Sequence, residues 1–325
     1  MQLPSNTPFF LGVNYPWRHY GQDFGRVGTE HSGISLPEAR ESVGSEFARI
    51  REPGASMVRW FLFGDGRGGF HADKGIARKP DEYLFADLAA TLALAEQHQL
   101  KLCFSLIDYL WLQDHSGKRP AHAHEHVFHF AGGREAFLQN VLIPLFREFR
   151  GHPALFAWEI ANEPEWAIRE FHAVSSAKLR YADFRAYAAE IARAAHEFGD
   201  APVTLGSARL MWVRAWIELG LDSYQAHHYP AGETETRKDF AQQILTIPPL
   251  DQPLWMGELP ARDLAPSGYA LPQALEICRT GGLCGAAVWR WTQPDVHGTD
   301  AAMGRLDPDE LKAWIASRQA EGQHA

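Results

Sequence analysis

Two glutamates end apolar segments of strand length, where a pair of carboxyl groups could perform acid–base or nucleophilic chemistry. Glu163 closes the run that begins at Leu155 and is followed by Pro164, and Glu258 closes the run that begins at Pro253. A carboxylate at the end of a buried strand loses hydration, so this position favours a functional group. Taken alone, each glutamate is also consistent with a solvated strand end.

The elements that must position this pair alternate regularly along the chain. Eight short apolar runs, mostly bounded by Gly or Pro, are apolar enough to be strands buried on both faces. They span residues 9–16, 56–64, 101–109, 155–163, 202–207, 224–229, 253–258 and 285–292. Helix-like segments lie between or after them, at residues 37–51, 82–99, 134–150, 175–198, 211–219, 236–245, 271–279 and 309–319.

This alternation predicts an α/β protein with a closed (β/α)8 barrel, the TIM barrel, as a single domain over residues 1–325 with its core at about 9–318. An open, doubly wound sheet is the alternative. It is weakened because no Gly-rich phosphate-binding loop follows any of the predicted strands.

The candidate site follows from the fold, because chemistry in a (β/α)8 barrel lies at the C-terminal ends of the strands. The fifth run ends in Gly206-Ser207 and supplies no candidate. The other runs end in polar or aromatic residues, which are Asn14, Trp17, Arg59, Asp108, Trp111, Asn162, Glu163, His227, Tyr229, Glu258, Trp289 and Trp291. Such an acidic and aromatic rim indicates a sugar-processing cleft.

The fourth and seventh strands lie nearly opposite one another across a barrel mouth, so Glu163 and Glu258 can face each other. Retaining glycosidases need two carboxyl groups about 5–5.5 Å apart, one protonated and one ionised. Arg59 would keep Glu258 ionised, and Tyr229 could donate a hydrogen bond to it. We expect Asn162 to bind the sugar 2-hydroxyl.

The ordered set of Asn162-Glu163-Pro164, Glu258, His227-x-Tyr229 and Arg59 resembles glycoside hydrolase family 5, in the clan of retaining (β/α)8 glycosidases that includes cellulases and mannanases. The resemblance implies that Glu163 is the acid/base and Glu258 the nucleophile. It also implies a sugar platform from a tryptophan of the eighth strand, either Trp289 or Trp291.

The chain departs from the family pattern at the end of the third strand. Many family members carry a histidine there, whereas this chain has Asp108. Asp108 or Trp111 would then contribute to sugar binding instead. Asn14 and Trp17 stand on the predicted rim but are as consistent with the core as with ligand binding. Glu159 shares strand parity with Glu163, and we interpret it as a buried partner for an arginine.

The charge and the apolar pattern of the sequence argue against two classes of protein, nucleic-acid-binding proteins and membrane-spanning proteins. The net charge is −9 and no block of Lys or Arg occurs, which argues against nucleic-acid binding. No apolar run approaches membrane-spanning length. No signal peptide is visible, so we expect a cytoplasmic enzyme, a monomer or small homo-oligomer, that acts on short β-linked gluco- or manno-type oligosaccharides without a cofactor.

Three other hypotheses remain open. A transglycosylase would use the same site with a sugar in place of water. A metal-dependent hydrolase would use the histidines of the segment 115–129, which we interpret instead as a polar loop, either an active-site lid or a subunit contact. A non-catalytic sugar-binding barrel would retain the aromatic rim without turnover.

Overall fold

The fold is described from a computed structural model, which places residues 9–112, 128, 131–171, 179–230, 240–261, 269–291 and 306–322. The histidine-rich segment predicted as a polar loop lies outside these described residues, as nearly all of it falls within 113–127 and 129–130. Within the placed residues, no helix has both the length and the apolar character needed to span a bilayer.

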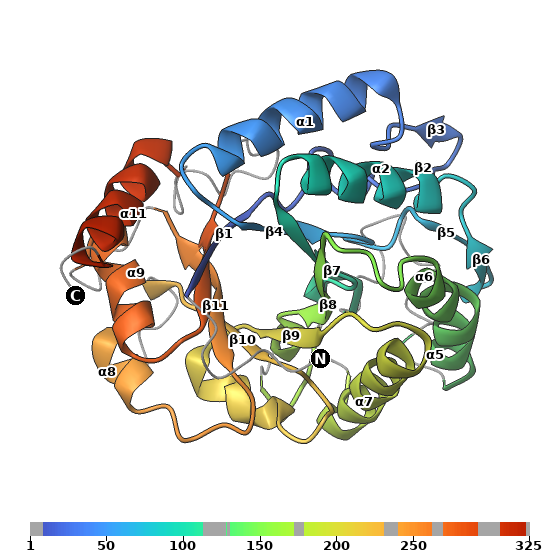
Figure 1. The fold of residues 1–325 in the computed structure, drawn as a ribbon. Helices are drawn as coiled ribbons and strands as arrows, with labels where there is room; N and C mark the ends of the chain where they lie inside the picture. The colour runs from blue at the N-terminus through green and yellow to red at the C-terminus, as the bar shows by residue number, and fades with distance from the viewer. Residues whose placement is uncertain are drawn as a thin grey trace.

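Eight parallel strands close into a barrel, which confirms the predicted fold class (Figure 1). The strands are β1 (Phe10–Asn14), β4 (Met57–Phe61), β7 (Lys101–Ser105), β8 (Leu155–Asn162), β9 (Val203–Ser207), β10 (Tyr224–His227), β11 (Leu254–Pro260) and β12 (Gly285–Trp289). Each strand pairs with its neighbours in chain order, and β1 pairs with both β4 and β12 to close the ring.

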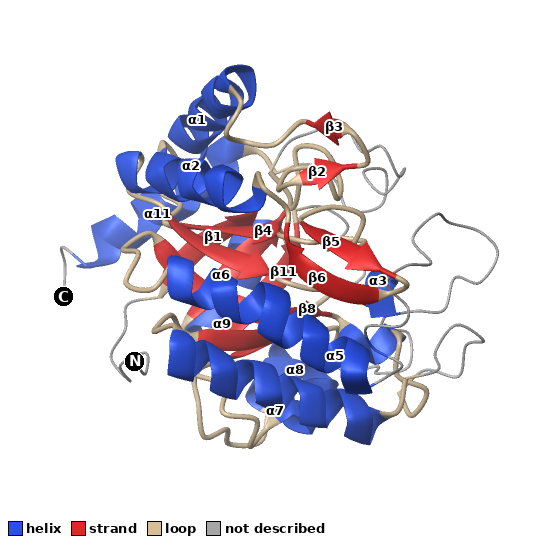
Figure 2. Cartoon of the chain, turned by 90° about the vertical axis from the view of Figure 1, so that its right-hand side faces the viewer, coloured by secondary structure: helices blue, strands red, loops and turns tan. Residues whose placement is uncertain are grey.

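Helices surround the strands, because each presents an apolar face that only the barrel can cover. Figure 2 shows the strands enclosed between α1 and α2 on one side and α5 and α7 on the other. The helices after the strands are α1 (Pro37–Arg51), α2 (Leu84–Gln97), α3 (Tyr109–Leu112), α5 (Ala131–Phe137), α6 (Ile143–Glu148), α7 (Tyr181–Phe198), α8 (Phe240–Leu245), α9 (Leu271–Thr280) and α11 (Pro308–Gly322). A π-helical turn, η2 (Leu138–Leu142), joins α5 to α6.

The segment predicted as an α-helix at 211–219 is instead a 3-10 helix, η4 (Leu210–Trp216). Its buried residues are Leu210, Val213 and Trp216, which are three residues apart. That spacing matches the three residues per turn of a 3-10 helix, so burial favours the tighter winding. A second short 3-10 helix, η3 (Pro164–Trp166), follows β8 directly.

Two small antiparallel hairpins were not predicted, and both lie outside the barrel in Figure 1. One, β2 (Arg26–Val27) with β3 (Glu30–His31), lies in the connection after β1. The other, β5 (Phe70–Asp73) with β6 (Ile76–Pro80), lies in the connection after β4. Because each hairpin follows the C-terminal end of a barrel strand, both belong to the connections that surround the barrel mouth.

Candidate active site

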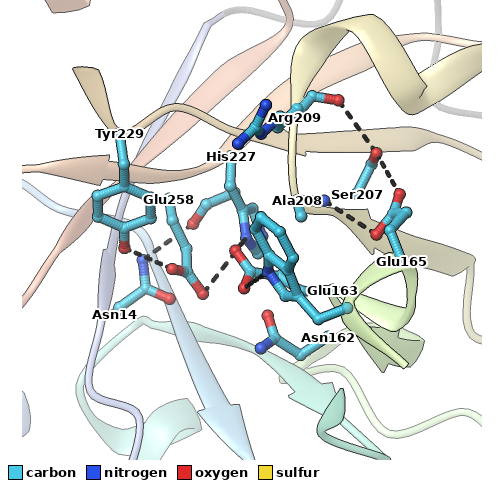
Figure 3. Close-up of polar contacts among 12 residues, drawn as sticks. Asn14, Asn162, Glu163, Glu165, Ser207, Ala208, Arg209, His227, Tyr229 and Glu258 are labelled. Carbon is cyan, nitrogen blue, oxygen red and sulfur yellow. Dashed lines mark hydrogen bonds and ion pairs between the residues drawn. The ribbon is translucent and has the colours of Figure 1, made fainter. Parts of the chain in front are cut away.

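The C-terminal ends of the strands bring the predicted catalytic residues together (Figure 3). Arg59 lies on β4, Asn162 ends β8, His227 ends β10, and Glu258 lies on β11. Glu163 is the first residue after β8. In Figure 3 the side chains of Glu163 and Glu258 point toward one another, with His227 beside them. One carboxylate oxygen of each glutamate and a ring nitrogen of His227 lie within 4.8 Å of one another.

Arg59 lies below this pair, is completely buried and forms ion pairs with two carboxylates. Its Nε and Nη2 donate to the two oxygens of Glu159 at 2.5 and 2.6 Å, which confirms the interpretation of Glu159 as a buried partner. Its Nη1 donates to Glu258 Oε1 at 2.6 Å and to Asn14 Oδ1 at 3.0 Å. Burial alone would lower the pKa of Arg59, but the charges of Glu159 and Glu258 outweigh it and raise the pKa.

Glu258 is held by donors on both oxygens. Besides Arg59 on Oε1, the Tyr229 hydroxyl donates to Oε2 at 2.5 Å. Burial raises the pKa of Glu258 above its ordinary value, while Arg59 and the Tyr229 hydrogen bond act to lower it. A carboxylate that accepts from a guanidinium and a phenol keeps its position, and both donors favour its ionised form, as a nucleophile requires.

Glu163 has different neighbours. Its Oε2 accepts from Trp166 Nε1 at 2.7 Å, and its Oε1 lies 2.7 Å from His227 Nδ1. Neither contact is to a permanent cation, and burial raises the pKa of Glu163 to about 7. A carboxyl that holds its proton near neutral pH can act as a general acid.

His227 contacts both carboxylates, with Nδ1 at 2.7 Å from Glu163 and 3.6 Å from Glu258. The ring is completely buried, and burial lowers the pKa of His227 to about 4. The imidazole is therefore neutral near pH 7. It can share a hydrogen bond with Glu163 without placing a cation beside it.

Asp108, which stands in place of the family histidine, belongs to a small network with Asn162. Asn162 Nδ2 donates to Asp108 Oδ1 at 3.2 Å, and Tyr20 donates its hydroxyl to Asp108 Oδ2 at 3.2 Å. Asn162 Oδ1 accepts from Arg59 Nη2 at 2.7 Å, so both ends of the amide have protein partners. This fixes the orientation of Asn162 and leaves one Nδ2 hydrogen for a ligand.

Asn14 supports the site from below. It is completely buried, and its Nδ2 donates to the Gly257 carbonyl at 2.9 Å while its Oδ1 accepts from Arg59. The residue therefore links β1, β4 and β11 just beneath the carboxylates. Its contacts fit a role in holding Arg59.

Two of the predicted tryptophans lie together at the rim. The ring centroids of Trp17 and Trp289 are 6.0 Å apart, and both rings also pack on Phe61. Trp17 is half-buried, and the Arg290 guanidinium lies 5.4 Å from its ring centroid. Trp289 ends β12, on the barrel mouth, and is 8% exposed, whereas Trp291 lies two residues beyond the strand.

Trp291 and Trp111 lie away from the rim. Trp291 is 1% exposed, and its Nε1 donates to Glu46 on α1 at 2.8 Å, because the chain has passed the strand end and turned outward. Trp111 packs among Phe63, Phe70, Phe128 and Phe137 with ring centroids 5.1 to 6.2 Å away. The structure therefore assigns both rings to packing rather than to the candidate site.

Sequence reasoning missed Tyr20 and Glu165. Tyr20 lies in the long connection after β1, where no periodicity marks it. Glu165 follows Pro164 at the start of a short helix, a position that is typical of a solvated acidic residue, yet it is completely buried. Only the hydrogen bonds of its side chain show its place in the site.

Two groups of described residues have donor atoms close enough to bind a metal ion. One is His71, Asp81 and Glu82, where Arg26 already forms ion pairs with both carboxylates. The other is Glu163, His227 and Glu258. There the donors from Arg59, Tyr229 and Trp166 occupy three of the four carboxylate oxygens, so a cation would have to displace them beside a buried guanidinium.

Comparisons with known proteins point to one group of enzymes. No protein-family model matches the chain. Two proteins named mannan endo-1,4-β-mannosidase, from Cryptopygus antarcticus and Mytilus edulis, are each 26% identical to it, over 164 and 163 residues respectively. Each match covers 50% of this chain but only 39% and 41% of the relative, so it spans about two fifths of each relative's length.

Solved structures show the same fold over nearly the whole chain. The β-mannanase from the blue mussel Mytilus edulis superposes with a TM-score of 0.72 at 21% identity, covering 94% of this chain and 92% of that one. The β-1,4-D-mannanase from Cryptopygus antarcticus gives 0.76 at 18% identity over 95% and 89%. A GH5_18 protein from Bifidobacterium longum subsp. infantis gives 0.60 at 16% identity over 96% and 79%. In sequence and fold, this chain is a (β/α)8 barrel similar to glycoside hydrolase family 5.

Proposed function

We propose that this chain is a retaining β-glycoside hydrolase that cleaves β-linked manno-oligosaccharides by double displacement. The observation that carries the proposal is the pair of carboxyl groups, Glu163 and Glu258, with oxygens within 4.8 Å and with different partners. This upper bound on the nearest oxygens is compatible with the separation of about 5–5.5 Å in retaining glycosidases, whereas inverting enzymes hold their carboxyl groups about 6.5–9.5 Å apart to admit a water.

In the first step a carboxylate oxygen of Glu258 bonds to the anomeric carbon as the glycosidic C–O bond breaks. Glu163 transfers its proton to the departing oxygen, so the leaving sugar departs as an alcohol. Tyr229 and Arg59 hold Glu258 in place for the attack. The spare Nδ2 hydrogen of Asn162 is available to the sugar 2-hydroxyl, where a hydrogen bond strengthens as positive charge develops on the ring.

In the second step Glu163, now ionised, takes a proton from water while the water oxygen bonds to the anomeric carbon. The bond between that carbon and Glu258 breaks, and Glu258 leaves as a carboxylate. One water is consumed for each glycosidic bond, and both glutamates return to their starting protonation states. If a second sugar replaces water, the same step gives transglycosylation.

The choice of manno-configured substrates rests on the names of the sequence relatives and of the structural neighbours. Gluco-configured substrates are the alternative, because the candidate site residues fit both sugars. Initial rates on matched β-1,4-linked manno- and gluco-oligosaccharides of equal length separate the two. We expect a higher kcat/KM on the manno series, and the reverse ranking would contradict the manno assignment.

Trapping of the covalent intermediate tests the mechanism. A 2-deoxy-2-fluoro-β-mannosyl fluoride slows both steps but keeps a good leaving group, so the glycosyl-enzyme should accumulate. We expect a mass increase of one fluorosugar per chain and a labelled peptide that contains Glu258. The Glu258→Gln variant should remain unlabelled. A label on another residue would contradict the assignment of the nucleophile.

The metal-dependent hypothesis makes the opposite prediction about chelators. The double displacement needs only the two carboxyl groups, so we expect full turnover after exhaustive dialysis against EDTA. Loss of activity that returns on addition of a divalent cation would favour the metal-dependent hypothesis over this one.

A further inference from the structure

Glu163 has an unusual backbone conformation. Its φ and ψ are 48° and 47°, in the left-handed region that residues with a side chain rarely adopt. Such a conformation persists only where the surrounding structure holds it, and it is enriched at functional sites. The turn that holds Glu163 is η3, the three residues that follow it.

Glu165, the middle residue of η3, anchors this turn to two other elements. Its Oε1 accepts from Ser207 Oγ at 2.6 Å and from Trp216 Nε1 at 2.7 Å, and its Oε2 accepts from the backbone nitrogen of Ala208 at 3.2 Å. Ser207 ends β9 and Trp216 ends η4. In Figure 3, Glu165 is directed toward Ser207 and Ala208 and away from Glu258.

The turn is also tied to the acid itself. The backbone nitrogen of Glu163 donates to the Gly206 carbonyl at 2.7 Å, and that of Trp166 donates to the Glu163 carbonyl at 3.2 Å. The Trp166 indole then returns to the Glu163 carboxyl at 2.7 Å. A shift of Glu165 would therefore move both the backbone of the acid and the indole that orients its carboxyl group.

A completely buried carboxyl group is a costly way to fill space, because it loses hydration and must have its oxygens satisfied. Burial raises the pKa of Glu165 to about 7, in agreement with that cost. An apolar side chain would pack there more easily but could not accept the three hydrogen bonds. The carboxyl group is thus suited to fix the geometry of the turn.

We propose that Glu165 is a positioning residue for Glu163, which it holds in register for proton transfer to the leaving group by anchoring η3 to β9 and η4. This inference rests on the proposed function, because it presumes that Glu163 is the acid. It assigns a role to the end of β9, the one strand end that supplied no candidate from the sequence.

The dependence of kcat/KM on the leaving group tests this role. A misplaced acid slows the first step only for substrates whose leaving group must be protonated. β-1,4-Mannotriose has a poor leaving group, whereas 2,4-dinitrophenyl β-mannoside needs no acid for the first step. For Glu165→Met we expect kcat/KM on mannotriose to fall at least about tenfold more than on the dinitrophenyl substrate. Glu165→Gln keeps an acceptor for Ser207 and Trp216 but turns its amide NH2 toward the Ala208 N–H, so it should recover part of the loss.

The matched control is Asp222→Asn. Asp222 is a buried carboxylate in the segment before β10, where it contacts the start of β9 by accepting from the backbone of Val203, and it also accepts from His196. It should lower both rates by the same factor, if at all. Should Glu165→Met fail to fold, Ser207→Ala and Trp216→Phe each remove one donor and should show the same selective loss at smaller size.

Glu163→Ala is the reference, and it must show the strongest leaving-group dependence of the set. If it shows none, the proposed function fails. If it does, but the Glu165, Ser207 and Trp216 variants lower both substrates equally, the positioning role of Glu165 is overturned while the proposed function stands.

Discussion

Glu258 and Glu163 are the same residue type at nearly the same depth, yet the chain surrounds them differently. Glu258 lies within a regular strand, β11, and its two oxygens accept from a guanidinium and a phenol. Glu163 lies just beyond β8 in a left-handed turn, and its oxygens meet an indole and a neutral imidazole. The first environment stabilises a negative charge, and the second leaves a proton in place.

The comparison shows how a symmetric pair acquires distinct roles. Burial raises the pKa of both carboxyl groups, so burial alone does not distinguish them. The two carboxyl groups differ in their direct contacts: Arg59 and Tyr229 donate to Glu258, whereas Trp166 and His227 contact Glu163. Substitutions that change one carboxyl group or its partners at a time should therefore differ in the size of their effects.

Removal of the nucleophile should have the largest effect. We expect Glu258→Ala to lower kcat/KM by more than about 10⁴-fold on every substrate, because without the carboxylate no glycosyl-enzyme forms. Steady-state assays on mannotriose and on the dinitrophenyl mannoside measure it. Glu170→Gln, a change at an exposed glutamate beyond η3, is the control and should retain wild-type rates. Retention of even a hundredth of the activity by Glu258→Ala would exclude this role.

Deprotonation of the acid, Glu163, should cause the fall of kcat/KM at alkaline pH. Glu163 must be protonated to donate, and its pKa is raised to about 7, so kcat/KM on mannotriose should fall about tenfold per unit above pH 7. The dinitrophenyl substrate should lack this decline in its first step. In Glu163→Ala the alkaline limb should disappear, together with about 10²- to 10⁴-fold of the mannotriose rate. An unchanged limb in this variant would assign the titration to another group.

Arg59, which forms the ion pair with Glu258, should also contribute to the free energy of unfolding. Arg59→Met leaves Glu159 and Glu258 buried without their cation, and we expect a loss of about 3–5 kcal/mol in the free energy of unfolding. Urea titration followed by tryptophan fluorescence measures it. The exposed pair Arg180–Asp183 provides the control, because Arg180→Met should change stability very little. Equal stability of the two variants would show that Arg59 does not stabilise the fold.

Substitution of Trp289, which ends β12, and of Trp291, two residues beyond it, should have the smallest effects, and these effects should differ in kind. Trp289→Ala should raise KM for mannotriose by about three- to tenfold, because a sugar loses its stacking surface. Trp291→Phe should leave KM unchanged and destabilise the fold by about 1 kcal/mol through loss of the hydrogen bond to Glu46. If Trp291→Phe raised KM while Trp289→Ala did not, the two assignments would have to be exchanged.

The barrel and the central pair were predictable because their signals are local. Each strand is a short apolar run with a clear end, and the fold places all such ends at one mouth. The alternation of side chains along a strand could not distinguish Trp289 from Trp291, because both fall on the same side of the backbone. Alternation does not indicate the residue at which the chain leaves the strand. Nothing in the sequence around Glu165 distinguishes a buried anchor from a solvated helix start.

The stereochemistry of the first-formed product tests the central claim most directly. Proton NMR of the anomeric signal, recorded during the first turnovers of mannotriose before mutarotation, reports whether the released reducing sugar keeps its configuration. Two displacements, at Glu258 and then by water, predict the β-anomer as the first product. Initial release of the α-anomer would show a single displacement and would contradict the proposed nucleophile.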